Sequence, residues 1–515
     1  MSLTMKENKY SKAFHTMITV GLAFVVNYGI NLVLTPYITE SLGTEAYGFV
    51  SLAKQFAQYA TIITTALDSF AARYITIAYH TGNKKEANRF FSSAFFGDVV
   101  LASGVMAAAV FCILFLERLL NISGNIVNDV KILFLFVFIN FWITTVFTVF
   151  SSSAYIENKL DMTGIFKGLS YITEGVVLYV LYVLFPDRIF YVGVGLIFAS
   201  IVVALSNVWI CRKYTPDLNI RKKNYSGQAV KRLVIDGIWT SVNSVGELLN
   251  NGLDLIVCNL MLSPLAMGQL AIAKTIGTIF QSLYAVVAQA FQPMFLKSYA
   301  ENNRKVLLQE LKRSMKISGM LANIGFAGFV ALGLVYYRLW IPNEDIQLVY
   351  RLTVITIMVS IASGPMQPLY YIYTLTVKKM VPCFVTIAGG LFNVAGMYLL
   401  INYAGMGVYA VAWTTVGVMA VINFGTNPLY MAHVLHLPWH TFYPNIIRNV
   451  ASCAVMVLLF KGLSALWLPD SWLTLALSVP FYAAAGAVVH LCIVCEKNDW
   501  HEIRTWLLRH GGRKK

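Results

Sequence analysis

Charged residues are scarce in this 515-residue chain: they make up 12% of it, whereas soluble globular proteins carry roughly 25%. Acidic residues are the scarcest, with 24 Asp and Glu against 39 Lys and Arg, and 58% of the residues are hydrophobic. A monomer in water does not tolerate the apolar surface that such a chain would expose. The composition therefore excludes a water-soluble protein and predicts an integral membrane protein.

Other features are also missing. The seven cysteines lie mainly in or beside apolar segments, which argues against a disulfide scaffold. Cys492 and Cys495 have C-x-x-C spacing without a second pair, so we interpret them as packing residues and expect no metal site. We find no nucleotide-binding loop and no nucleophile–base pair in a polar segment, so we expect neither an enzyme nor a cofactor. The apolar run 13–36 lacks an A-x-A cleavage site and is predicted to remain as a first span.

Fourteen apolar runs have the roughly 20 residues that a helix needs to cross a membrane. We therefore expect an all-α integral membrane fold with about fourteen transmembrane helices. The predicted spans are 14–36, 46–69, 92–116, 130–154, 164–185, 189–211, 233–260, 266–295, 314–337, 350–376, 380–402, 405–427, 445–467 and 471–494.

The basic residues indicate the orientation of these spans. With the N-terminus in the cytoplasm, 31 of the 39 Lys and Arg fall in cytoplasmic segments, six fall outside, and Lys54 and Lys274 fall within spans. Lys and Arg are enriched in cytoplasmic loops of membrane proteins. The bias predicts that both termini are cytoplasmic, and it explains the net charge of +15 without nucleic acid as a partner.

An ungapped offset of 220 residues relates the two halves of the chain. Residues 42–55, LGTEAYGFVSLAKQ, share five identities with residues 262–275, LSPLAMGQLAIAKT. The offset pairs spans of the same orientation, and parallel repeats of six spans are a transporter design. Further identities at this offset join Tyr79, Asn83 and Lys85 to Tyr299, Asn303 and Lys305, and Asn31 to Asn251.

The repeat predicts two pseudo-symmetric six-helix lobes followed by a terminal helix pair. The predicted domains are an N-lobe at 1–211, a cytoplasmic linker at 212–232, a C-lobe at 233–430, the terminal pair at 431–495 and a cytoplasmic basic tail at 496–515. Aromatic and aliphatic residues among the arginines of the tail suit an amphipathic helix on the membrane surface.

Polar residues recur at helical spacing along the span 233–260. On one continuous helix Asp236, Glu247 and Asp254 fall within about 40° of one another, and the first and last are about 27 Å apart along the axis. Such a stripe faces water or protein, so we predict a wet passage between the lobes. The alternative is that the stripe joins buried helices. The polar residues predicted to line the passage are Asn27, Asn31, Asn243 and Asn251.

Lys54 and Lys274 form a second group, at matching positions of the repeat. Each lies about 12 Å from the outer end of its span. An ammonium group suits a phosphate, so we predict that the pair attracts a pyrophosphate or an acidic sugar in the passage. The alternative is an internal ion pair, most simply between Lys274 and Asp254.

Acidic residues within spans suggest ion coupling. Glu174, Glu247 and Asp254 are candidates for binding H⁺ or Na⁺, because a buried carboxylate can hold a proton near neutral pH. Three further acids, Asp68, Asp98 and Asp236, lie near the cytoplasmic ends of their spans, and we expect them to be solvated.

Residues 36–48, PYITESLGTEAYG, resemble the pattern P-x-hydrophobic … L-G … Y-G of the multidrug/oligosaccharidyl-lipid/polysaccharide exporter superfamily. Over its full length the chain is similar to the polysaccharide (Wzx-type) flippases of that superfamily. The resemblance implies alternating access that moves a polyprenyl-pyrophosphate-linked oligosaccharide from the cytoplasmic to the periplasmic leaflet of a bacterial inner membrane, for O-antigen, capsule or exopolysaccharide synthesis. Its implied partners are this substrate, membrane lipids and the polysaccharide polymerase machinery.

Two other functions compete with this one. A cation-coupled multidrug exporter of the same superfamily is favoured by the acids of span 233–260 but not by the paired lysines. A polytopic glycan polymerase or ligase would need a sizeable extramembrane loop with catalytic residues, and no predicted outer loop exceeds about fifteen residues.

Overall fold

The computed structural model describes residues 3–376, 378 and 380–496, and these residues form helices and turns but no strand. Inside lipid, backbone N–H and C=O groups find no water, so an apolar chain satisfies them within helices. The predicted all-helical membrane fold is confirmed. The predicted basic tail at 496–515 lies outside the described residues except for Glu496, which accepts a hydrogen bond from Arg448.

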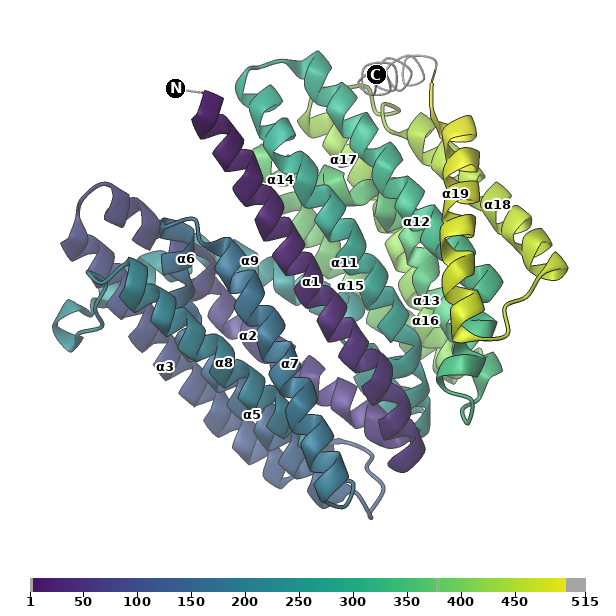
Figure 1. The fold of residues 1–515 in the computed structure, drawn as a ribbon, viewed down its shortest axis with the longest axis horizontal. Coiled ribbons are helices and arrows are strands. Elements are labelled where there is room, and N and C mark those ends of the chain that lie inside the picture. Colours follow the sequence, from purple (N-terminus) through teal and green to yellow (C-terminus); the bar gives the residue numbers. More distant parts are fainter. Residues whose placement is uncertain (1–2, 377, 379, 497–515) are drawn as a thin grey trace. The chain divides into compact units, whose positions relative to one another are not determined.

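The chain divides into two compact units, Met1–Ala271 and Ile272–Lys515. In the first unit α1 packs on α7, α2 packs on α3, α5 and α9, and α8 packs on α5 and α7; α3, α5 and α8 run side by side (Figure 1). The helices of this unit are α1 (Leu3–Ser41), α2 (Thr44–His80), α3 (Lys84–Leu114), α4 (Leu116–Leu119), α5 (Val127–Thr148), α6 (Ser152–Ile156), α7 (Leu160–Leu184), α8 (Tyr191–Tyr214), α9 (Gly227–Asn251), α10 (Asp254–Met261) and the first residues of α11 (Pro264–Ala300).

In the second unit α12 is the central helix, and it packs on α13, α18 and α19 (Figure 1). α16 lies between α13 and α15, with which it is in contact. The helices of this unit, besides the rest of α11, are α12 (Arg304–Trp340), α13 (Ile346–Met366), α14 (Tyr371–Leu375), α15 (Met380–Asn402), α16 (Val408–Ala420), α17 (Asn427–Val434), α18 (Tyr443–Leu466) and α19 (Trp472–Val494).

Every one of the fourteen predicted spans coincides with a helical segment, but only twelve described helices are long and apolar enough to cross a membrane by composition. The two that fall short are α2 and α9, which carry the charged and amide side chains singled out above. The two helices pack on each other, so protein covers part of their polar surface. The count of fourteen spans stays a prediction.

The 220-residue repeat extends through the secondary structure of both halves. α2 and α11 each have 37 residues, and their first and last residues differ by 220 in number. The same offset joins the first residues of α3 and α12, the first residues of α7 and α15, and the last residues of α8 and α17. The predicted repeat therefore extends over these four pairs of helices, and six helices in each half stays a prediction.

The turns that start α3 and α12 show the repeat at atomic detail. Asn83 and Asn303 cap these helices, and each side-chain oxygen accepts a hydrogen bond from the backbone N–H three residues later. A residue with positive φ precedes each cap, Gly82 at 77° in the first turn and Asn302 at 52° in the second. The turn between α11 and α12 has only three residues, 301–303.

Both halves also break a helix at the same point. A 3₁₀ turn at Val149–Ser151 separates α5 from α6, and another at Gln367–Tyr370 separates α13 from α14. Pro365 precedes the second break and Pro368 lies within it, and proline removes a backbone donor from a helix. A single turn of π-helix at Val421–Thr426 similarly divides the predicted span 405–427 between α16 and α17.

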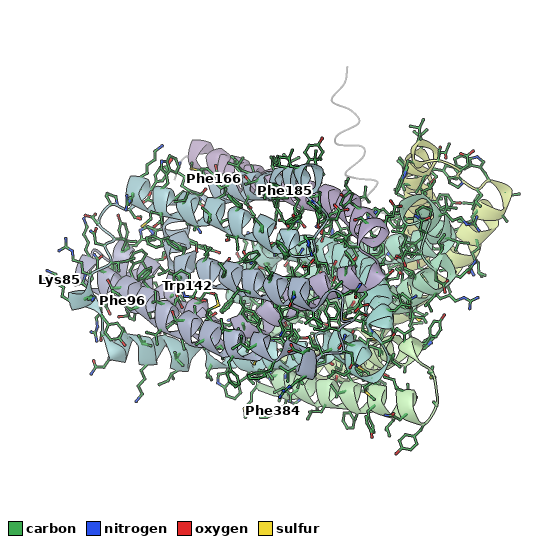
Figure 2. The ribbon with its side chains drawn as sticks, turned by 90° about the horizontal axis from the view of Figure 1, so that it is seen from below. Lys85, Phe96, Trp142, Phe166, Phe185 and Phe384 are labelled. Atoms are coloured by element: carbon green, nitrogen blue, oxygen red, sulfur yellow. The ribbon has the colours of Figure 1, made fainter. Side chains whose placement is uncertain are left out.

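Apolar side chains cover the outside of the helices. On the terminal pair Leu458, Leu473 and Leu477 are 72%, 71% and 65% exposed, and Phe185 and Phe384, labelled in Figure 2, are more than half exposed. A soluble monomer rarely exposes such continuous apolar surface. These helices therefore present their outer faces to lipid.

The terminal pair is fixed to α12 by buried polar contacts. The Asn323 amide donates to the Asn449 carbonyl at 2.9 Å, and His490 lies 2.9 Å from the Lys316 carbonyl and 3.1 Å from the Ser452 hydroxyl. Asn323, Asn449 and Ser452 are fully buried. Hydrogen bonds of this kind hold helices together in lipid, where the hydrophobic effect does not drive helix association.

The boundary between the compact units differs from the predicted lobe boundary. The first unit ends at Ala271, so it includes α9 and α10, which the sequence assigned to the C-lobe. Within this unit the contact of α9 with α2 is closest at Gly237, where a Cβ atom would lie 1.9 Å from the Ala66 carbonyl oxygen. One turn later the Ser241 hydroxyl donates to the Ile62 carbonyl at 2.9 Å.

Replacing Gly237 tests this helix contact. We expect Gly237→Leu to lower the free energy of unfolding by at least about 1–3 kcal/mol, because the side chain would force α9 away from the α2 backbone. Thermal unfolding of the purified protein in detergent measures the effect. The control is Gly104→Ala, since a Cβ at Gly104 meets nothing within 4 Å. An unchanged melting temperature for Gly237→Leu would contradict the contact.

Candidate functional site

The first unit brings together two of the predicted site residues, Lys54 and Glu174. Lys54 is half-buried on α2, and Glu174 on α7 is 6% exposed. The Glu174 carboxylate lies within range of an electrostatic attraction to the Lys54 ammonium group. The positive charge predicted to bind an anionic substrate is therefore partly balanced inside the unit.

Asn27 and Asn31 on α1 bond mainly to their own helix. The Asn31 amide donates to the Asn27 carbonyl at 2.9 Å, and the Thr35 hydroxyl donates to the Asn31 carbonyl at 2.8 Å. Both asparagines are half-buried, and α1 packs on α7. Their lining of a passage stays a prediction.

The predicted continuous helix 233–260 is wrong. The chain leaves the α-helix after Asn251, and Gly252 and Leu253 separate α9 from α10. Tyr59 of α2 donates a hydrogen bond to the Gly252 carbonyl at the break. Asp254 therefore starts a new helix, and its angle relative to Asp236 and Glu247 cannot be taken from one helical wheel. Broken helices in membrane proteins occur where protein or a water-filled cavity receives the freed backbone groups.

The acids of this stripe lie in different surroundings. Asp236 accepts a hydrogen bond from Tyr74 of α2, and Asp254 is 4% exposed, with its charge acting on the Tyr59 phenol. Glu247 is exposed and accepts a hydrogen bond from the Asn243 amide at 2.8 Å. The acids at the two ends of the stripe thus connect α9 and α10 to α2. Glu247, which lies between those ends, is exposed. Asn251 is exposed as well.

Lys274 lies in the second unit, where it is half-buried. It is the eleventh residue of α11, as Lys54 is the eleventh of α2. The two lysines therefore occupy matching positions in their helices, as the repeat predicts. Their joint action on one ligand stays a prediction.

A cavity of about 650 Å³ opens in the first unit between α2 and the break that joins α5 to α6. Asp68 and Arg73 contribute opposite charges to its wall. The wall also carries the hydroxyl groups of Ser69, Thr76, Thr148, Ser151, Ser152 and Tyr155. The sequence had indicated Arg73 only as part of the cytoplasmic charge bias. Val149 and Ser151 of the 3₁₀ turn between α5 and α6 line the cavity, and no proline marks this turn.

The expected solvation of Asp98 is wrong. Asp98 on α3 is fully buried, and the charge of Asp68 on α2 acts on its carboxyl group. Asp68 itself is only half-buried because it borders the cavity. Two ionised carboxylates that act on each other repel, and burial adds to the cost of each charge. The pair is thus a further candidate for ion coupling.

The chain matches a known family over more than half of its length. The model of the family described as "Polysaccharide biosynthesis protein" matches residues 15–299. The chain is also 25% identical, over 93% of its own length and 94% of the relative's, to a protein of Bacillus subtilis (strain 168) described as "Uncharacterized membrane protein EpsK".

Two solved structures share the fold. The lipid II flippase MurJ in an inward closed conformation superposes with a TM-score of 0.66 at 16% identity, covering 92% of this chain and 98% of MurJ. A multidrug resistance transporter of the MATE family and MOP superfamily, in an inward-facing conformation, superposes with a TM-score of 0.63 at 15% identity, covering 81% and 98%. At these identities the likeness shows the fold alone.

A double-mutant cycle tests the attraction between Lys54 and Glu174. We expect Lys54→Met to destabilise the protein by about 1 kcal/mol or more, because it leaves a buried carboxylate without its counter-charge. Adding Glu174→Gln to the Lys54→Met variant is expected to restore most of the lost stability, with a coupling free energy of about 0.5–3 kcal/mol between the two residues. Thermal unfolding of the four proteins measures it, with the exposed Lys85→Met as a control. Strictly additive effects would show that the two groups do not interact.

Proposed function

Because the chain belongs to the polysaccharide biosynthesis protein family, we propose that it is a flippase for a lipid-linked oligosaccharide. It would move a polyprenyl-pyrophosphate-linked glycan from the cytoplasmic to the periplasmic leaflet of a bacterial inner membrane, with both termini in the cytoplasm. The glycan would serve O-antigen, capsule or exopolysaccharide synthesis. The polysaccharide polymerase machinery would take up the product.

The cavity in the first unit is the observation that carries this proposal. Its volume of about 650 Å³ lies within the range of roughly 300–1,000 Å³ that is usual for ligand sites. Sugars present many hydroxyl groups that donate and accept hydrogen bonds, and the wall offers hydroxyl groups, the Asp68 carboxyl and the Arg73 guanidinium as partners. Such polar lining within a membrane protein supports a hydrophilic head group as cargo.

Transport would follow from alternating access. The head group would enter the polar interior while its polyprenyl tail stays in lipid, and the lysines at matching positions of α2 and α11 would attract its pyrophosphate. Binding must stabilise the head group without trapping it in either state. The paired helix breaks at Val149–Ser151 and Gln367–Tyr370 are positions where both halves can bend.

A second candidate is a cation-coupled multidrug exporter, which has the same fold. The exposed Glu247 and the buried Asp68–Asp98 pair favour it, because acids attract cationic drugs and bind coupling ions. Lys54 and Lys274 oppose it, since they would repel such cargo. Cargo choice in reconstituted vesicles separates the two functions.

Loss of the lysines tests the cargo. We expect Lys54→Ala and Lys274→Ala each to slow flipping of a polyprenyl-pyrophosphate oligosaccharide about tenfold or more, since each removes a charge-assisted contact to phosphate. The measurement is the appearance of the glycan outside proteoliposomes. The control is Lys85→Ala, which removes an exposed lysine in the first turn of α3. Normal flipping by both variants, with intact expression, would exclude the binding role.

Cells offer a second readout of the same function. Deletion of the gene is expected to leave the lipid-linked glycan on the cytoplasmic leaflet. If the glycan still reaches the periplasm while a cationic dye accumulates in the cells, the multidrug exporter is correct instead.

Ion gradients test the role of the acids. We expect flipping to respond to an imposed H⁺ or Na⁺ gradient, and the response to be lost in one or more of Glu174→Gln, Glu247→Gln, Asp254→Asn and Asp98→Asn, which remove a carboxylate from the spans. Flipping rates with and without each gradient provide the measurement. Flipping rates that change with neither ion gradient would contradict ion coupling, but they would not contradict the proposed cargo.

A further inference from the structure

A second cavity, of about 230 Å³, lies at the basic end of the second unit. Four parts of the unit meet there: the last turn of α11, the first turns of α12, Thr376 and Lys378 after α14, and the residues that follow α17. The proposed function makes no use of this cavity. Its residues are Ser298, Tyr299, Asn302, Arg304, Leu307, Leu308, Leu311, Thr376, Lys378, Val434, Leu435, His436 and Leu437.

The floor of the cavity is apolar and firmly packed. Leu307, Leu311 and Val434 are buried members of the hydrophobic cluster that joins α11, α12, α14, α17 and α18. The turn 301–303 on one side is held by the hydrogen bond from the Asn303 N–H to the Ser298 carbonyl at 3.0 Å. The cavity therefore belongs to the folded unit and does not depend on a loose loop.

The rim is cationic. Arg304, Lys378 and His436 are exposed around the opening and offer guanidinium, ammonium and imidazole donors. Two acids lie nearby: Glu310 accepts a hydrogen bond from the hydroxyl of Ser298 in the cavity wall at 2.7 Å, and Glu301 lies 3.9 Å from Lys297. Within the described part of the chain no carboxylate forms an ion pair with Arg304 or Lys378.

The matching position of the first unit carries an ion pair. In the first unit Lys84, the counterpart of Arg304, forms an ion pair with Asp217 at 2.6 Å. Asp217 lies three residues after the end of α8, and Leu437 lies three residues after the end of α17. At this position the first unit has a carboxylate that pairs with Lys84. The second unit has Leu437 there and an open cavity, and among the described residues Arg304 forms no ion pair.

We propose that this cavity binds the phosphate head group of an anionic membrane lipid, which takes the place of the missing carboxylate. Its volume is below the roughly 300 Å³ of drug-sized sites, so it suits a small head group. Basic pockets between transmembrane helices on the cytoplasmic side bind anionic lipid head groups in this way. The apolar floor, next to a cationic rim, matches the junction of phosphate and acyl chain better than it matches free phosphate. The proposal is independent of the flipped cargo.

Two kinds of variant test the site. Arg304→Gln/Lys378→Gln removes the rim charges, and its matched control is Lys85→Gln/Lys305→Gln, which removes two exposed lysines outside the cavity; Lys85 projects from the first unit in Figure 2. Leu437→Asp supplies the carboxylate that the first unit has, and its matched control is Leu437→Asn. The readout is retention of phosphatidylglycerol, against phosphatidylcholine, by native mass spectrometry of the full chain after detergent washing.

The expected result is selective retention of phosphatidylglycerol that falls about tenfold or more in Arg304→Gln/Lys378→Gln and in Leu437→Asp, and changes little in both controls. Equal losses in the Lys85→Gln/Lys305→Gln control would overturn the proposal in favour of general surface charge. Unchanged retention in Leu437→Asp would also overturn it. Displacement of the lipid from the parent protein by millimolar inorganic phosphate would assign the cavity to free phosphate instead.

Discussion

A polar side chain within a membrane must be covered by protein or by water, and this constraint shapes the first unit more than any other. α2 and α9 carry too many polar groups to face lipid on all sides. They are packed so closely that only glycine fits at position 237, and the hydrogen bonds from Ser241 and Tyr74 cross between them. The polar groups that remain exposed, such as Glu247, are then available for ligands.

The two halves of the repeat share positions at which helices begin and end, but they differ in the side chains near those positions. The turns before α3 and α12 have the same cap and the same backbone hydrogen bonds, although a glycine precedes the cap in one and an asparagine in the other. The cation that follows the cap meets an aspartate in the first unit and an open cavity in the second. The two halves therefore share helix bounds and a turn, whereas the groups around the first cation differ between them.

Helix positions were predictable because apolar runs of about 20 residues have few alternatives in lipid. The helix break after Asn251 was not, since Gly252 is compatible with either a continuous or a broken helix and a contact with Tyr59 decides between them. The burial of Asp98 was missed for a similar reason: distance from a span end says how deep a residue lies, but not which neighbours cover it. The cavity beside Arg73 needs two segments about 75 residues apart, which no local pattern reveals.

The helix pair α18 and α19 makes buried polar contacts with α12. His490 lies against the Lys316 carbonyl, and the Asn449 carbonyl accepts a hydrogen bond from the Asn323 amide of α12, in a buried interface. A chain shortened before α18 would leave the outer side of α12, with the buried amide of Asn323 and the carbonyl of Lys316, facing hydrocarbon. The last two helices therefore act as a cover that keeps these polar groups of α12 away from lipid.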